Sequence, residues 1–233
     1  MNIQRSIKIH DSTAFARARR AGQLAAATLD YIAPYVKPGI STGELDDICH
    51  DYIKRNGAIA APLGYKGFPR ANCISVNHVV CHGIPSNEKY LHDGNILNID
   101  VTVKLDGWHG DSSRMYIAGR AGTKAIKLCD ITYDCLMAGI EVVKPGAHLG
   151  DIGYAIQTLA ESKNYSVVRD FTGHGIGEIF HDDPHIFHFG NKGQGIQFVP
   201  GMIFTIEPMI NAGKKDIKQM PDGWTIVTKD RSL

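Results

Sequence analysis

The fold is decided by residues 98–111, which read Asn-Ile-Asp-Val-Thr-Val-Lys-Leu-Asp-Gly-Trp-His-Gly-Asp. An Asp-Gly pair between alternating residues is a strong sign of a β-hairpin, because a type I′ turn needs positive φ at both central positions. With Asp106-Gly107 as the two-residue loop, Thr102 faces Asp111. Asp100 and Asp111 then share one face as diagonal neighbours, roughly 7–8 Å apart at the backbone.

The two faces of this hairpin have opposite character. Leu97, Ile99, Val101 and Val103 alternate on the first strand and make an apolar core face. The opposite face carries the two aspartates, which repel each other unless a cation lies between them or both are solvated on an exposed sheet. A pair of divalent ions, roughly 3.5–4 Å apart in two-metal hydrolytic sites, would fit there.

Composition indicates an ordinary globular protein. The 233 residues are 43% hydrophobic and 21% charged, with a formal net charge of +1, so no basic excess indicates nucleic-acid binding. Five cysteines without a Cys-x-x-Cys pattern favour reduced thiols over a disulfide framework or a zinc knuckle. No apolar run reaches the length of a signal peptide or a membrane span. We therefore expect a cytoplasmic protein.

The second half of the chain repeats the first. Residues 36–39, Val-Lys-Pro-Gly, recur at 143–146, an offset of 107 (143 − 36). Residues 93–100 have their counterpart in residues 200–207 at the same offset. The repeat predicts a duplicated α+β unit with halves of about 1–120 and 121–233, packed around an approximate two-fold axis in one domain that spans residues 1–233.

This symmetry gives Asp100 an equivalent, Glu207, at the end of a matching small-polar, Ile, acid triplet. Together with Asp111, three acids then converge on an otherwise apolar sheet. Such a cluster is costly without cations, and oxygen ligands suit hard or borderline metals. His174 lies in a Gly-His-Gly-Ile-Gly segment, where the flanking glycines let other backbone approach while the ring projects.

Local patterns predict the remaining elements. Helices are expected where apolar residues recur at helical spacing behind a cap, and strands where apolar residues alternate. The predicted helices are 11–32, 42–55 behind a Ser41–Glu44 capping box, 122–143 and 149–164; the predicted strands are 73–81, 97–105, 108–118, 166–171 and 202–210; residues 180–185 are predicted as a polar turn.

Five segments resemble the methionine aminopeptidases, in their bacterial type I form, and the resemblance runs from about residue 6 to residue 233. They are residues 79–85 (VVCHGIP), 98–102 (NIDVT), 109–111 (HGD), 173–177 (GHGIG) and 205–209 (TIEPM). The resemblance implies the α+β pita-bread fold, a pseudo-two-fold duplicated unit with a central antiparallel sheet and helices on its outer face. It also implies removal of the initiator methionine from nascent polypeptides with one or two divalent ions, among Co, Mn, Fe, Zn and Ni. A monomer near the ribosomal exit tunnel, with no membrane or nucleic-acid partner of its own, is expected.

Carried over residue by residue, the resemblance assigns a metal ligand to each of four positions. Asp100 would hold one ion through both oxygens, Asp111 would bridge the two ions, and His174 and Glu207 would hold the other. A metal lowers the pKa of water and polarises the scissile carbonyl. Glu207 could then accept the proton of the water as general base.

The resemblance also assigns substrate contacts. His82 and His181 match positions that touch the substrate, and His181 would steady the tetrahedral intermediate. The methionine pocket would be lined by Tyr65, Phe68, Cys73, Phe180 and Trp224, a soft apolar lining that suits a thioether. The alternatives are a plain core role for Phe68, Phe180 and Trp224 and a solvated loop around His181, where His185 and His188 also lie. Pro62 stands where many members of the family carry a cysteine.

The family continues beyond the position of Leu233 with a strand that carries a further metal-bridging glutamate. For the 233-residue chain we therefore expect weak binding of a second ion and impaired activity. Three hypotheses stay open: a metallo-aminopeptidase, a non-catalytic pita-bread paralogue that binds peptides or ribosomes, and a creatinase-like or proline-specific hydrolase. No His-Glu-x-x-His helix occurs, which excludes the zincin class.

Overall fold

The computed structural model describes residues 7–233. Its helices are α1 (Ser12–Ile32), α2 (Thr42–Arg55), α3 (Thr123–Glu141) and α4 (Leu149–Ser162), with short 3-10 turns η1 (Ala33–Tyr35) and η2 (Tyr65–Gly67). Its strands are β1 (Ile59–Ala60), β2 (Cys73–Val76), β3 (Val79–Cys81), β4 (Ile96–Leu105), β5 (Trp108–Ile117), β6 (Ser166–Val167), β7 (Gly173–Gly175), β8 (Asp182–Ile186), β9 (Ile210–Asn211), β10 (Ile217–Gln219) and β11 (Ile226–Thr228).

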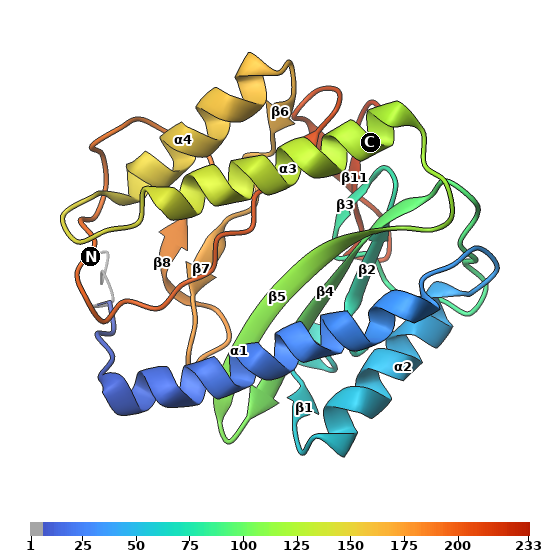
Figure 1. Ribbon diagram of the computed structural model, residues 1–233, viewed down its shortest axis with the longest axis horizontal. Coiled ribbons are helices and arrows are strands. Elements are labelled where there is room, and N and C mark those ends of the chain that lie inside the picture. Colours follow the sequence, from blue (N-terminus) through green and yellow to red (C-terminus); the bar gives the residue numbers. More distant parts are fainter. Residues whose placement is uncertain (1–6) are drawn as a thin grey trace.

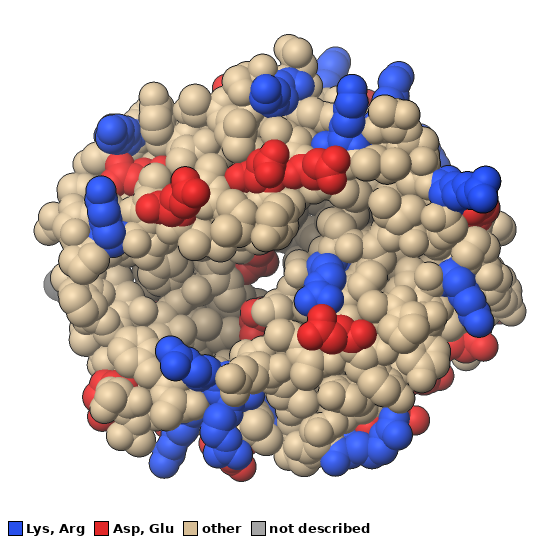
Figure 2. All heavy atoms as spheres, viewed as in Figure 1, with Lys and Arg blue, Asp and Glu red and all other residues tan. Residues whose placement is uncertain are grey.

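The helices form two pairs on opposite sides of the strands (Figure 1). Helices α1 and α2 lie on one side, α3 and α4 lie on the other, and the long β4–β5 hairpin runs between them. The strands pair antiparallel in four groups: β1, β4 and β2 with β5 on β4; β10, β11 and β3; β6 with β9; and β7 with β8. Figure 2 shows a hollow between the two sides.

The predicted hairpin forms in the predicted register. Leu105 pairs with Trp108 and Thr102 with Asp111. Asp106 and Gly107 have φ of 50° and 84°, the left-handed backbone that a type I′ turn requires. The core face is confirmed as well, since Leu97, Ile99, Val101 and Val103 are all fully buried.

Helix α1 covers that core face. Asp11 caps the helix by accepting a hydrogen bond from the Ala14 N–H at 2.8 Å. Ala21, Ala25 and Leu29 then pack into the first apolar cluster with the hairpin. The approach is close at Gly110, where an added Cβ would lie only 2.2 Å from the backbone carbon of Ala21. Only glycine lets the helix backbone come so near to β5.

The two halves share β-bridges and helix-capping hydrogen bonds at equivalent positions, 107 residues apart. Isolated β-bridges join Ser41 to Tyr90 and His148 to Gln197. Glu44 accepts a hydrogen bond from the backbone N–H of Ser41, as Asp151 does from that of His148. Two apolar clusters follow this division, one from residues 21–118 and one mainly from residues 125–210. These equivalences support the duplicated unit, while the domain boundaries stay a prediction.

Several predicted strands were wrong in extent. The run 73–81 is two strands, because Asn77 turns the chain with φ of 54°, a conformation that asparagine tolerates. The strand predicted at 166–171 is only β6, residues 166–167. Residues 182–185, predicted as turn, belong to β8, because they pair with β7.

The strand predicted at 202–210 does not form as such. The segment hydrogen-bonds to β7 at two places, Thr205 N–H to His174 O and Ile176 N–H to Ile203 O, and joins β7 through a single bridge at Phe204. Pro208 lacks an N–H and breaks any longer ladder. In the described part of the chain, only Ile210–Asn211 at its end becomes a strand, β9.

Among residues 7–233, no helix is both long and apolar enough to cross a membrane.

Two glycine substitutions on the two sides of the α1–β5 contact should act in opposite directions. Gly110→Ala should lower the free energy of unfolding by about 1–3 kcal/mol, because backbone on both sides must separate to admit the methyl group. Gly22→Ala, in the interior of α1 with open space at its Cβ, should raise it by about 0.5–1 kcal/mol. Urea unfolding of both variants measures the difference; equal effects would contradict the close packing at Gly110.

Candidate metal centre

Three carboxylates meet on the polar face of the β4–β5 hairpin. Asp100 lies opposite Cys73 on β2 and Ser113 on β5, and Asp111 lies diagonally across from it. Burial raises the pKa of Asp100 well above its usual range, and the carboxylates of Asp111 and Glu207 raise it further. Burial, followed by the charge of Asp111, raises the pKa of Glu207 to about 7. Electrostatic repulsion therefore links residues that are 107 positions apart in the sequence.

The Glu207 side chain is partly exposed to water, unlike the other members of the cluster. Its side chain is 40% exposed, whereas that of Asp111 is 14% and that of His174 is 7% exposed. Protein atoms surround the carboxylate on most sides, but one side stays open to water. The surrounding protein atoms and the charge of Asp111 both disfavour the ionised form of Glu207, so both raise its pKa.

His174 completes the cluster from β7. Its Nε2 lies 3.6 Å from Oδ2 of Asp111 and 3.5 Å from Oε1 of Glu207. Its Nδ1 lies 3.0 Å from the Gly175 carbonyl oxygen and donates to it, which leaves Nε2 free to act as a ligand. Burial lowers the pKa of His174, but the two carboxylates more than offset this and raise it above its ordinary value.

The glycines beside His174 allow this placement. A Cβ on Gly173 would lie 2.4 Å from the carbonyl oxygen of Thr205, and one on Gly175 would lie 2.1 Å from that of Asp183. The segment that carries Glu207 and the β8 strand therefore both press against β7. The predicted reason for the glycine-rich segment, close backbone approach, agrees with these contacts.

The donor set fits a divalent cation. Among the described residues, no lysine or arginine forms an ion pair with Asp100, Asp111 or Glu207. Metal ligands at about 2.0–2.2 Å stand roughly 3–3.5 Å from one another, only slightly closer than the 3.5 and 3.6 Å found here. No group of three or more His, Cys, Asp or Glu side chains within residues 7–233 is already close enough to hold an ion.

Thr205 joins Glu207 to the strand β7 that carries His174, a role that the sequence did not predict. Its hydroxyl donates to Oε1 of Glu207 at 2.6 Å and accepts from the backbone N–H of His174 at 2.9 Å. One side chain thus orients both a predicted ligand and the strand that carries another. The sequence marked Thr205 only indirectly, as the small polar residue of the Thr-Ile-Glu triplet and as the first residue of the segment 205–209.

His181 stands beside His174 at the edge of the cluster. The two rings are 4.3 Å apart between centroids, and Phe180 lies 4.1 Å from His181. The Tyr65 hydroxyl is 3.0 Å from Nδ1 of His181. Burial, followed by the charge of His174, lowers the pKa of His181 to about 4, so its imidazole is neutral at pH 7. His181 is nevertheless exposed, so the solvated-loop alternative stays open beside these contacts.

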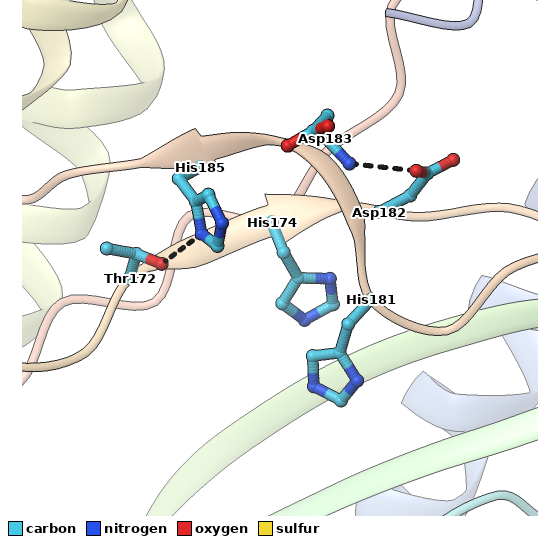
Figure 3. Close-up of a pocket in the computed structure, with 6 residues that line it drawn as sticks. All are labelled: Thr172, His174, His181, Asp182, Asp183 and His185. Atoms are coloured by element: carbon cyan, nitrogen blue, oxygen red, sulfur yellow. Dashed lines mark hydrogen bonds between the residues drawn. The ribbon is translucent and has the colours of Figure 1, made fainter. Parts of the chain in front are cut away.

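A cavity of about 240 Å³ opens beside these histidines (Figure 3). The rings of His174, His181 and His185 lie along it, while Asp182 and Asp183 lie at one end. The structure adds His185 to this region: it is the cross-strand partner of His174 and is 3.1 Å from the hydroxyl of Thr172.

The other predicted pocket residues form a second aromatic group. Phe68 and Trp224 meet edge to face at 5.2 Å, and His82 lies 6.2 Å from Trp224. His82 adopts a left-handed backbone with φ of 54°. Cys73 is buried opposite Asp100, and burial raises the pKa of its thiol well above the usual range, which keeps it protonated. Phe68 is itself buried, so its core role and a pocket role both stay open.

His109 is a further residue that the sequence analysis left without a role. Its ring stacks on Phe180 at 5.4 Å with an interplanar angle of 11°. Its backbone N–H and its Nδ1 lie 2.8 and 2.9 Å from the carbonyl oxygen of Gly177. His109 thereby holds the loop that carries Phe180 and His181 against the hairpin.

Comparison with known proteins identifies the family. The sequence pattern of metallopeptidase family M24 matches residues 16–229. The chain belongs to metallopeptidase family M24. This M24 chain is 58% identical to the methionine aminopeptidase of Rickettsia prowazekii over 229 residues, which cover 98% of the chain and 88% of the relative. It is 54% identical to that of Escherichia coli, covering 93% of the chain and 83% of the relative.

The fold agrees with the M24 assignment. The crystal structure of the Rickettsia prowazekii methionine aminopeptidase superposes with a TM-score of 0.97, covering 98% of this chain and 92% of that one. The predicted resemblance and the predicted α+β pita-bread fold are therefore confirmed. Members of M24 are metallopeptidases, so the predicted use of divalent metal is confirmed at that level. The ligands and substrate contacts assigned here stay predictions.

Removing the Thr205 hydroxyl should loosen the cluster. Thr205→Val keeps the shape but leaves Oε1 of Glu207 without its donor, so affinity for a divalent ion should fall by about 10- to 100-fold. Calorimetric titration with Mn²⁺ measures this affinity. Thr205→Ser, which keeps the hydroxyl, is the matched control. If the valine and serine variants bind the metal equally well, the hydrogen bond to Glu207 has no such role.

Proposed function

We propose that this chain removes the N-terminal methionine of peptides at a divalent metal centre formed by Asp100, Asp111, His174 and Glu207. The observation that carries the proposal is the convergence of three carboxylates and an imidazole from the two repeated halves, without a basic side chain to neutralise them among the described residues. Acidic clusters of this kind are costly unless a cation occupies them.

A bound divalent ion supplies the activation of water and the polarisation of the scissile carbonyl. The protein supplies the proton acceptor, for which Glu207 is suited because its carboxylate lies within the cluster of proposed ligands and is oriented by the Thr205 hydroxyl. The carboxylate is held by the Thr205 hydroxyl and is open to water on one side. Glu207 can therefore take a proton from an attacking water and later pass it to the leaving amine.

His181 is suited to donate a hydrogen bond to the oxygen on which negative charge develops. Its imidazole is neutral at pH 7, and we assign the ring proton to Nε2, with the Tyr65 hydroxyl 3.0 Å away donating to Nδ1. A fixed donor at the edge of the metal cluster stabilises a tetrahedral intermediate more than the planar ground state. His82 is proposed as a second substrate contact, since its ring packs edge to face on Trp224 and Phe171.

The methionine side chain is proposed to bind among Tyr65, Phe68, Cys73, Phe180 and Trp224. Their rings meet at centroid distances of 5.0 to 5.2 Å in two groups, and the Cys73 thiol is protonated and apolar in character. Thioether sulfur makes favourable contacts with aromatic edges, and an unbranched side chain adapts to an irregular pocket. The pocket therefore favours methionine over charged or branched residues.

The proposal extends to the cellular compartment, the natural substrates and the oligomeric state. The five cysteines are all free, as is typical of proteins in a reducing compartment such as the cytoplasm. Nascent chains near the ribosome are the expected substrates, and a monomer is the expected state. The non-catalytic paralogue predicts peptide binding without hydrolysis, and a proline-specific hydrolase predicts cleavage of Xaa-Pro bonds.

A peptide assay tests the proposal. The protein, loaded with Mn²⁺ or Co²⁺, should release free methionine from Met-Ala-Ser and should leave Gly-Pro and Leu-Ala-Ser intact. Chelation should abolish the release, and addition of the ion should restore it. Binding of Met-Ala-Ser without any release would favour the non-catalytic paralogue instead. The same assay beside the longer relatives measures whether this chain is slower.

Substitutions separate the two proposed tasks of the acids. Asp111→Asn should abolish or strongly weaken the binding of Mn²⁺ measured by calorimetry, because it removes the negative charge of the ligand that is proposed to bridge the two ions. Glu207→Gln, assayed at saturating Mn²⁺ because Glu207 is also a proposed ligand, should lower kcat by about 10²–10⁴-fold, since the amide cannot accept the proton. Asp51→Asn, an exposed change on α2, is the matched control and should leave both quantities unchanged. Undiminished methionine release by Glu207→Gln would overturn the role of Glu207.

A further inference from the structure

His188 lies behind the metal cluster, on the side away from the cavity. It follows β8 by two residues, and the alternation of that strand continues through it: Pro184, Ile186 and His188 are buried, whereas His185 and Phe187 are exposed. The His188 side chain is completely inaccessible to water. It therefore belongs to the core side of the β7–β8 hairpin, while His174 and His185 face the cavity (Figure 3).

The His188 ring contacts the backbone of the proposed general base. Its Nε2 accepts a hydrogen bond from the N–H of Glu207 at 3.1 Å. An accepting Nε2 requires a neutral ring with its proton on Nδ1. Burial lowers the pKa of His188 to about 4, in keeping with that neutral form.

Glu207 needs such an anchor because its segment is not a regular strand. The neighbouring backbone bonds lie at Thr205 on one side and Met209 on the other. Pro208, the next residue, has no N–H to contribute. Within the described residues, the N–H of Glu207 has His188 as its hydrogen-bond partner.

The protonated Nδ1 shows that space filling alone does not explain this histidine. It is buried and has no hydrogen-bond partner among residues 7–233. An unsatisfied buried donor is unfavourable, and an apolar side chain of similar length would avoid it. What an apolar side chain could not provide is the acceptor at Nε2.

From these contacts we propose that His188 is a positioning residue for Glu207. His188 fixes the backbone at residue 207 while Thr205 fixes the carboxylate, so that Oε1 faces His174 and the metal cluster. Losing either contact lets the carboxylate swing into the open side of the cleft, where its side chain is already 40% exposed. The inference rests on the proposed function, since it assigns a task to the residue that orients its general base.

Two nearly isosteric substitutions test the acceptor. His188→Gln places an amide oxygen near the position of Nε2, whereas His188→Met has the same length without an acceptor. We expect His188→Met to lose about 10- to 100-fold in both Mn²⁺ affinity and kcat, with an unchanged KM for Met-Ala-Ser, because the methionine pocket is untouched. His188→Gln should restore both to within a few-fold of the wild type.

A packing effect would give a different pattern. Ile186→Val, on the same buried side of β8, perturbs the core but leaves the hydrogen bond of His188 to Glu207 in place, and it should leave Mn²⁺ affinity unchanged even where thermal unfolding shifts. Equal Mn²⁺ affinity and equal kcat for His188→Met and His188→Gln would overturn the proposal. So would a loss in His188→Met that the valine variant reproduces.

If His188→Met does not fold, two polar variants, His188→Gln and His188→Asn, are compared instead. His188→Asn is one methylene shorter than His188→Gln, so its amide oxygen falls short of the Glu207 N–H. The glutamine variant should bind Mn²⁺ more tightly than the asparagine variant, and equal binding would refute the positioning role. Failure of the wild type to bind Mn²⁺ or release methionine would instead refute the proposed function.

Discussion

Repulsion among the carboxylates of Asp100, Asp111 and Glu207 is the constraint on which the rest of this structure depends. Burial and mutual charge raise the pKa of both Asp100 and Glu207, which means that the protein holds them together against an electrostatic cost. Within the described residues, His174 is the one group that could carry a positive charge within ion-pair distance of these carboxylates. A cation turns this cost into binding free energy, and the M24 family is defined by metal-dependent peptidases.

The fold meets this constraint by bringing backbone unusually close at a few glycines. Gly110 lets α1 lie against β5, so the hairpin that carries two of the acids is backed by a helix. Gly173 and Gly175 let the Glu207 segment and β8 press on the strand of His174. Side chains then add orientation to proximity: Thr205 and His188 hold Glu207 at its two ends, and His109 holds the loop of His181. Rigid support of this kind is what a metal site requires of its surroundings.

The cluster also separates two kinds of histidine. His174 is drawn toward protonation by the acids around it, whereas burial keeps His181 and His188 neutral at pH 7. One ring is thus suited to bind a cation, one to donate to a developing anion and one to accept a backbone hydrogen bond. The three differ in environment rather than in residue type, and their separation along the chain is only 14 residues, from 174 to 188.

The sequence by itself determined the hairpin, its register and the duplicated unit. A two-residue Asp-Gly turn leaves one register in which apolar residues share a face, and an offset of 107 residues at two motifs marks equivalent positions. The starts of the four helices were predicted to within one residue, because capping is a local interaction, whereas α3 and α4 end two residues before their predicted ends. The resemblance to the methionine aminopeptidases also followed from short motifs, as the M24 match and the relatives confirm.

Only the tertiary structure decided how residues 202–210 pair and what supports Glu207. Strand formation there depends on neighbours from distant parts of the chain, so alternation alone predicted a strand that the described residues do not form. The roles of His109 and His188 rest on hydrogen bonds to partners 68 and 19 residues away, and Thr205 combines its bond to Glu207 with one to His174, 31 residues away. Such contacts have no local signature, because one histidine among eleven looks like another until the fold shows what its ring nitrogens meet.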